Sequence, residues 1–100
     1  MDVCRVVGQG VATVKDPGLR AAKLLLCVPC DAQGTPTGPM FAAADTVGAG
    51  EHELVLVARG SAARATQRTS EAPVDAAIIG IVDALSMGGE TVYRKDHENR

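Results

Sequence analysis

The sequence predicts an all-β protein, folded as a small barrel or sandwich of short strands. Blocks rich in valine, leucine and isoleucine recur at short intervals along the 100 residues, as at 23–28 and 53–58. Turns that contain glycine and proline, such as 34–39, separate these blocks, as expected for short strands with brief connections. Five or six strands of this kind are expected. Closing them into a barrel would remove the exposed edges of an open sheet.

The N-terminal half of the chain predicts three strands. Residues 3–14 are rich in valine around Gly8 and Gly10, so we expect a long, curved first strand that the glycines bend or bulge. Residues 23–28 are an apolar block bounded by turn residues, which indicates a second strand covered on both faces for part of its length. Residues 40–46 are expected to form the third strand.

The C-terminal half predicts further strands and one helical turn. Residues 53–58 have apolar side chains on both faces of a strand. Residues 61–65 are expected to form a single helical turn, because the Ser61 oxygen can accept an otherwise unpaired N–H at a helix start. Residues 75–83 contain helix-favouring alanines, but their isoleucines and Gly80 favour a strand.

The chain is expected to end in a loop, a short strand and a tail. Residues 86–89 are predicted to form the loop, and residues 91–93 a last short C-terminal strand. Residues 96–100 alternate in charge, so we expect a charged tail there. A single domain is therefore predicted over residues 1–95.

Charge and composition exclude several classes of function. The formal net charge is −2 with both signs interspersed, which gives no positive field to attract nucleic acid. Phe41 and Tyr93 are the only aromatic residues. No stretch approaches the roughly 20 apolar residues that cross a bilayer, and the first residues lack the pattern of a secretion signal. We therefore expect a cytosolic protein without nucleic-acid or membrane partners.

The three cysteines are Cys4, Cys27 and Cys30, an odd number that argues against a disulfide framework. Cys27 and Cys30 have the spacing of a redox dithiol, so a small cytosolic thiol oxidoreductase is an alternative function. Such a dithiol needs its first cysteine at a helix N-terminus, which lowers the thiol pKa. Because a predicted strand precedes this pair, we favour buried thiols that act as small hydrophobic groups.

No constellation of residues predicts a catalytic, cofactor or metal site. His52 stands between two glutamates, but neighbouring residues of an extended chain point in opposite directions, and His97 lies in the tail. Ser61 lacks the second glycine of a nucleophile elbow. Gly48 and Gly50 lack the Lys-Ser or Lys-Thr of a phosphate loop. We interpret these glycines as sites of positive φ or of close approach by another chain.

Charged residues flank several predicted strands, and most are expected to be solvated strand ends: Asp45, Arg59, Arg64, Asp75 and Asp83. Arg64 is the residue we expect to bridge subunits, because a guanidinium fork suits carboxylates at an interface. Asp75 and Asp83 are its candidate partners. The candidate subunit contacts are therefore Gly48, Ala49, Gly50, Arg64, Asp75 and Asp83.

Four segments taken together resemble the small pentameric proteins that close the vertices of bacterial microcompartment shells, including those of carboxysomes and ethanolamine-utilisation compartments. The segments are the first strand with Gly8 and Gly10 followed by residues 12–15, the 45–50 loop, residues 59–64 and residues 75–83. Each is a weak signal alone, and together they are specific. Many members of that family have a glycine where His52 stands in this chain.

The resemblance implies a five-stranded barrel of the oligonucleotide-binding type, five copies of which form a ring with a narrow axial opening. It also implies a non-enzymatic shell component without a cofactor, whose partners are further copies of itself and hexameric shell proteins. Gly60, Ser61 and Ala62 are the candidates for the axial opening, because small side chains let five copies crowd an axis. An oligonucleotide-binding module is a third hypothesis, but it needs a basic groove and stacking aromatics that this chain lacks.

Overall fold

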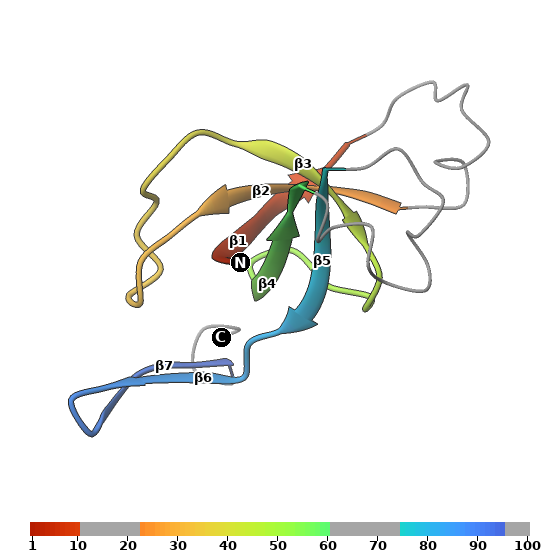
Figure 1. Cartoon of the computed structure of the whole chain (residues 1–100). Helices are drawn as coiled ribbons and strands as arrows, with labels where there is room; N and C mark the ends of the chain where they lie inside the picture. The colour runs from red at the N-terminus through yellow and green to blue at the C-terminus, as the bar shows by residue number, and fades with distance from the viewer. Residues whose placement is uncertain (11–22, 61–74, 96–100) are drawn as a thin grey trace, which may run out of the picture.

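The computed structural model of the chain describes residues 1–10, 23–60 and 75–95. Its strands are β1 (Asp2–Gln9), β2 (Lys23–Pro29), β3 (Phe41–Asp45), β4 (Leu54–Arg59), β5 (Ala76–Ile81), β6 (Ala84–Met87) and β7 (Glu90–Arg94). The first five close into a barrel in the order β1-β2-β3-β5-β4, and β6 and β7 form a separate hairpin outside it (Figure 1). The predicted all-β class and small five-stranded barrel are confirmed.

The first strand is bulged, as its glycines predict. β1 runs antiparallel to both β2 and β4, and its register with β2 shifts between Val6 and Gly8. The shift leaves Val7 without a partner on β2, and a bulge of this kind increases the local bend and twist of a strand. The part of the predicted first strand at residues 11–14 lies outside the described residues.

The barrel closes where β5 meets β3 and β4. β5 is antiparallel to β4 over most of its length, and it is parallel to β3 through two pairs, Ala44 with Ala77 and Asp45 with Ile78. The strand predicted at residues 75–83 is therefore confirmed. The β-branched isoleucines prevail over the helix propensity of the alanines, because a pleated, half-buried surface suits branched side chains.

Alternate residues of the strands fill the interior of the barrel. Its fully buried members include Cys4, Val6, Leu25, Cys27, Val55, Val57 and Ile78. Burying a large aliphatic side chain contributes roughly 1.5–3 kcal/mol. The small side chains of Ala43 and Ala76 complete this cluster, so the core is built from medium and small residues.

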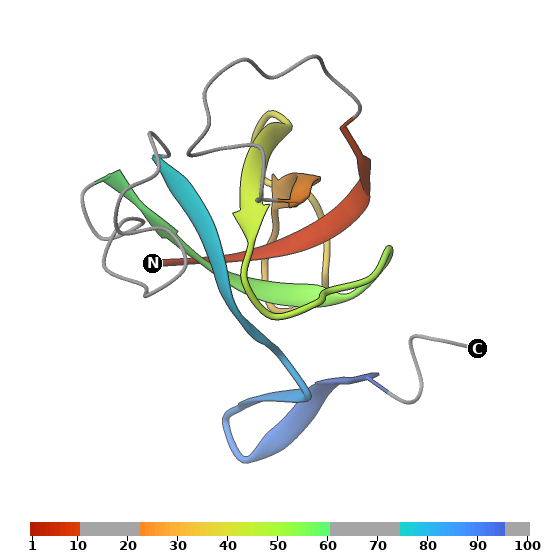
Figure 2. The same cartoon turned by 90° about the vertical axis from the view of Figure 1, so that its right-hand side faces the viewer.

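A second apolar cluster lies between the barrel and the hairpin. Leu54, Val82 and Tyr93 form its buried centre. Leu54 and Val55 are adjacent on β4 and belong to different clusters, so this strand is buried on both faces, as its sequence predicts. Figure 2 shows the hairpin beyond the end of β5, on the side away from β2.

The end of the chain differs from the prediction of a loop at residues 86–89. Ser86 and Met87 belong to β6, where they pair with β7, and only Gly88 and Gly89 form the turn. Both glycines have positive φ angles, 60° and 83°, as a two-residue hairpin turn of type I′ requires. The polar Ser86 favoured a loop in the sequence, whereas the strand forms because this turn pairs it with β7.

The remaining expectations for the C-terminal part have mixed outcomes. The last strand predicted at residues 91–93 is confirmed within β7. The helical turn predicted at residues 61–65 and the charged tail at 96–100 lie outside the described residues. Both stay predictions.

Candidate subunit interface

The loop between β3 and β4 begins with a buried carboxylate. Asp45 is 7% exposed, and its Oδ1 accepts hydrogen bonds from the backbone N–H groups of Val47 and Gly48, both at 3.1 Å. Its Oδ2 accepts a third bond from Ala49 at 3.1 Å. A buried carboxylate is expensive unless it is hydrogen-bonded, and here the turn supplies the donors. Asp45 is therefore an exception among the charged residues, most of which were expected to be solvated strand ends.

The three candidate contacts in this loop are placed differently. Ala49 is 2% exposed and packs in the barrel core, so its side chain stabilises its own subunit. Gly48 and Gly50 on either side of it are exposed. Gly48 has a φ of 75°, which an L side chain rarely adopts. The loop therefore presents its backbone at these two glycines to the surroundings.

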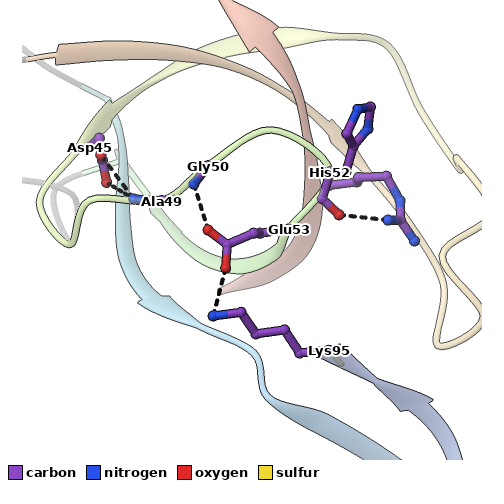
Figure 3. Close-up of polar contacts among 7 residues, drawn as sticks. Asp45, Ala49, Gly50, His52, Glu53 and Lys95 are labelled. Atoms are coloured by element: carbon purple, nitrogen blue, oxygen red, sulfur yellow. Dashed lines mark hydrogen bonds and ion pairs between the residues drawn. The ribbon is translucent and has the colours of Figure 1, made fainter. Parts of the chain in front are cut away.

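Glu53 closes the other end of the loop and ties it to the hairpin. Its Oε1 accepts the backbone N–H of Gly50 at 2.6 Å, and its Oε2 pairs with the Lys95 Nζ at 2.8 Å (Figure 3). The hydrogen bond from Lys95 is the main reason that the pKa of the Glu53 carboxyl lies below its ordinary value. The same bond raises the pKa of Lys95.

Arg5 fastens the tip of the loop. Its Nη1 donates to the backbone oxygen of His52 at 2.7 Å, and the N–H of His52 donates to the Val6 oxygen at 2.7 Å. His52 has a φ of 71°, in the left-handed region that favours glycine. A glycine would adopt this backbone conformation without strain. His52 itself is exposed at the tip of the loop.

The remaining candidates are only partly described. Gly60 is exposed, and its N–H donates to the backbone oxygen of Asp75 at 2.8 Å, so a candidate for the axial opening and a candidate contact lie side by side. Asp83 is exposed, and its backbone oxygen accepts the N–H of Lys95 at 2.9 Å. Ser61, Ala62 and Arg64 lie outside the described residues.

Comparison with known proteins identifies the family. A family model described as "Ethanolamine utilisation protein EutN/carboxysome" matches residues 1–83. The chain belongs to this EutN/CcmL family. It is similar to the bacterial microcompartment shell vertex protein EutN of Salmonella typhimurium, at 45% identity over 95% of this chain and 96% of that protein. The resemblance drawn from the sequence is confirmed.

Solved structures of the EutN/CcmL type share the fold. The structure of Gloeobacter violaceus CcmL has a TM-score of 0.88 and 42% identity, and the match covers 96% of this chain and 99% of that one. The pentameric microcompartment shell protein GrpN from Rhodospirillum rubrum has a TM-score of 0.75 and 38% identity, over 87% of this chain and 100% of that one. The five-stranded barrel is therefore the fold of this family.

The cysteines of this EutN/CcmL chain are not arranged as a redox dithiol. Cys27 points into the barrel core, whereas Cys30 packs against the second cluster beneath the hairpin. Burial raises the pKa of Cys4 to about 12 and of Cys27 to about 11, and it also raises the pKa of Cys30. Because the thiolate is the reactive form, burial lowers the reactivity of these thiols, and the oxidoreductase hypothesis has no support.

Sequence reasoning missed the polar contacts that shape the ends of the EutN/CcmL barrel. Arg59 pairs with Asp2 at 2.9 Å, and its guanidinium lies 3.7 Å from the centroid of the Phe41 ring. The spacing of Asp45 and Gly48 was a usable signal, since Asp side chains accept N–H groups two to four residues ahead in turns. The pairs of Glu53 with Lys95 and of Arg59 with Asp2 join residues distant in sequence, and no local pattern marks them.

The described part of the chain lacks two other kinds of functional feature, a metal-binding cluster and a membrane-spanning helix. Residues 1–10, 23–60 and 75–95 contain no group of three or more histidine, cysteine or acidic side chains placed to hold a metal ion. Over the same residues there is no helix long and apolar enough to cross a membrane.

Proposed function

We propose that this chain is a structural shell protein that forms a homopentamer and caps the vertices of a bacterial microcompartment in the cytoplasm. The observation that carries the proposal is its 45% identity, over nearly the whole of both chains, with a protein named as a shell vertex protein. The pentameric GrpN, with the same barrel, supports five as the number of subunits. The role is to close a corner of the shell, without catalysis or a cofactor.

The ring needs a head-to-tail interface, in which two different surfaces of each subunit meet and the rotation closes after five copies. We propose that Gly48, Gly50, Asp75 and Asp83 lie near this interface, together with Arg64. Exposed backbone at the two glycines would allow close approach of the neighbouring chain. Ala49 contributes by holding the loop in place from inside the barrel.

We propose Gly60, Ser61 and Ala62 as the lining of the axial opening. The exposed position of Gly60 beside Asp75 supports this, since it puts the start of the segment at the surface of the barrel. Hexameric shell proteins are the proposed outer partners of the ring. Residues 1–95 are proposed as one domain, and residues 96–100 as a charged tail.

Native mass spectrometry of the purified chain tests the proposal. The expected mass is five times the 10.3 kDa of one chain. A monomer, or a ring of any other order, at the concentrations found in cells would contradict it. In the pentamer, Arg64→Ala is expected to promote dissociation on dilution, whereas Lys23→Ala, on an exposed lysine of β2, is the control and keeps the mass of five chains.

A further inference from the structure

Two elements far apart in the sequence meet at a single carboxylate. Glu53 stands at the end of the 45–53 loop, and Lys95 follows β7. The Glu53 side chain is 13% exposed, and each of its two oxygens has a different partner: Gly50 on the loop and Lys95 beyond the hairpin (Figure 3). The loop and the hairpin are therefore joined through one planar group.

Besides this ion pair, the hairpin is attached to the barrel through the second apolar cluster, to which both Tyr93 and Leu85 contribute. Tyr93 packs against Leu54 and Val82, and the N–H of Val82 donates to the Leu54 oxygen at 2.8 Å. Figures 1 and 2 both show the rest of the hairpin extending away from the barrel. Because a two-stranded hairpin is only marginally stable by itself, its position depends on these contacts at its base.

We propose that Glu53 is a latch that couples the position of the β6–β7 hairpin to the conformation of the 45–53 loop. The two carboxylate oxygens move as one rigid unit, so a displacement of Lys95 turns the oxygen that holds the N–H of Gly50. A change in the loop also acts on Glu53, since a Cβ added at Gly50 would lie 3.2 Å from the Glu53 Oε1. Neither partner can shift without disturbing the other.

The latch gives this chain a way to order two surfaces together. Under the proposed function, the loop at Gly48 and Gly50 contacts a neighbouring subunit. Binding of that subunit to the loop then also fixes the position of the hairpin. The coupling itself belongs to the single chain. It holds whatever the number of subunits, so its test is separate from the test of the pentamer.

Hydrogen–deuterium exchange, read by mass spectrometry on peptides that cover residues 46–53 and 84–95, tests the latch from both sides. Lys95→Met removes the cation at the hairpin, and exchange in the loop peptide is expected to become about five- to tenfold faster, although no loop residue is changed. Gly50→Ala pushes on Glu53 from the loop, and exchange in the hairpin peptide is expected to change at least twofold. Coupling of this kind is reciprocal.

Arg94→Met is the matched control, because it removes a neighbouring cation that is exposed on β7 and is not bonded to Glu53. Exchange in the loop peptide should match that of the unchanged protein. The latch is overturned if Lys95→Met affects only the hairpin peptide, or if Arg94→Met accelerates the loop as strongly. Native mass recorded on the same samples shows separately whether the pentamer forms.

Discussion

The carboxylate of Asp45 holds the backbone N–H of Ala49 through both of its oxygens, at 3.3 and 3.1 Å. Because Asp45 also accepts from Val47 and Gly48, Asp45→Ala leaves several N–H groups of the turn without an acceptor. A buried donor without a partner costs about 1–3 kcal/mol. We expect Asp45→Ala to lower the free energy of unfolding by about 2–3 kcal/mol, measured by urea denaturation at a fixed chain concentration.

Asp45→Asn is the control for this prediction. The amide keeps one oxygen acceptor for the turn and loses the charge, so about half of the loss is expected. An alanine variant as stable as the unchanged protein would show that water replaces the carboxylate at no cost, contrary to the burial of Asp45.

The pair of Glu53 and Lys95 predicts how stability depends on pH. The pKa of Glu53 in the folded chain lies below its ordinary value of 4.5, so its contribution is complete above about that pH and is lost as the pH falls through the folded pKa. Glu53→Gln should therefore be less stable than the unchanged protein at pH 7, and the difference should shrink as the pH falls below 4.5.

At the alkaline end the same pair acts through Lys95. Its folded pKa lies above 10.5, so its contribution is complete below that pH and is lost as the pH rises through the folded pKa.

Thermal unfolding midpoints of the unchanged protein and of Glu53→Gln, recorded from pH 3 to 8, measure the loss of the Glu53 contribution in acid. Glu51→Gln, at an exposed turn position, is the control, and a gap between Glu53→Gln and the unchanged protein that stays constant over this range would refute the prediction.

Much of the barrel could be predicted from short-range patterns. Apolar blocks bounded by turns locate β2, β3 and β4, and the isoleucines locate β5 against the helix propensity of its alanines. These patterns work because each strand needs alternate apolar residues for a shared interior. The strand β6 was missed, since Ala84–Met87 is short, partly polar and mostly exposed. Its stability comes from pairing with β7 across the Gly88–Gly89 turn.

The candidate interface could be predicted only in outline. The glycines on either side of Ala49 marked the loop, because glycine often signals positive φ or close approach. The burial of Ala49 itself, and the carboxylates that hold the loop, depend on which strands meet in three dimensions. Long-range pairs such as Glu53 with Lys95 leave no periodic trace in a sequence.

The thiols are predicted to stabilise the chain by packing. Cys27 is fully buried in the barrel core, so Cys27→Ala is expected to lower the free energy of unfolding by about 1–2 kcal/mol through the cavity that it leaves. Cys27→Ser has a similar size but buries a hydroxyl, and it should be at least as destabilising. A functional dithiol would give the opposite pattern, in which both variants fold normally and lose only redox activity.

Labelling with a thiol reagent gives an independent measurement. The raised pKa values of Cys4 and Cys27 leave little thiolate at pH 8, so both should react much more slowly in the native protein than in urea. Cys30, which is only partly buried, should react first. Rapid native labelling of Cys27 would contradict its place in the core.

The stability of the β6–β7 hairpin is predicted to depend on its two-glycine turn. Gly88 and Gly89 have open space around them, so a substitution there acts through the backbone and not through a clash. A residue with a Cβ loses roughly 1–2 kcal/mol in the left-handed region, and asparagine tolerates it best. Gly89→Val should therefore speed hydrogen exchange in the peptide covering residues 84–95 about tenfold, whereas Gly88→Asn should leave it within twofold. Equal effects of the two variants would mean that the turn is not of type I′, and that β6 and β7 are paired in another register.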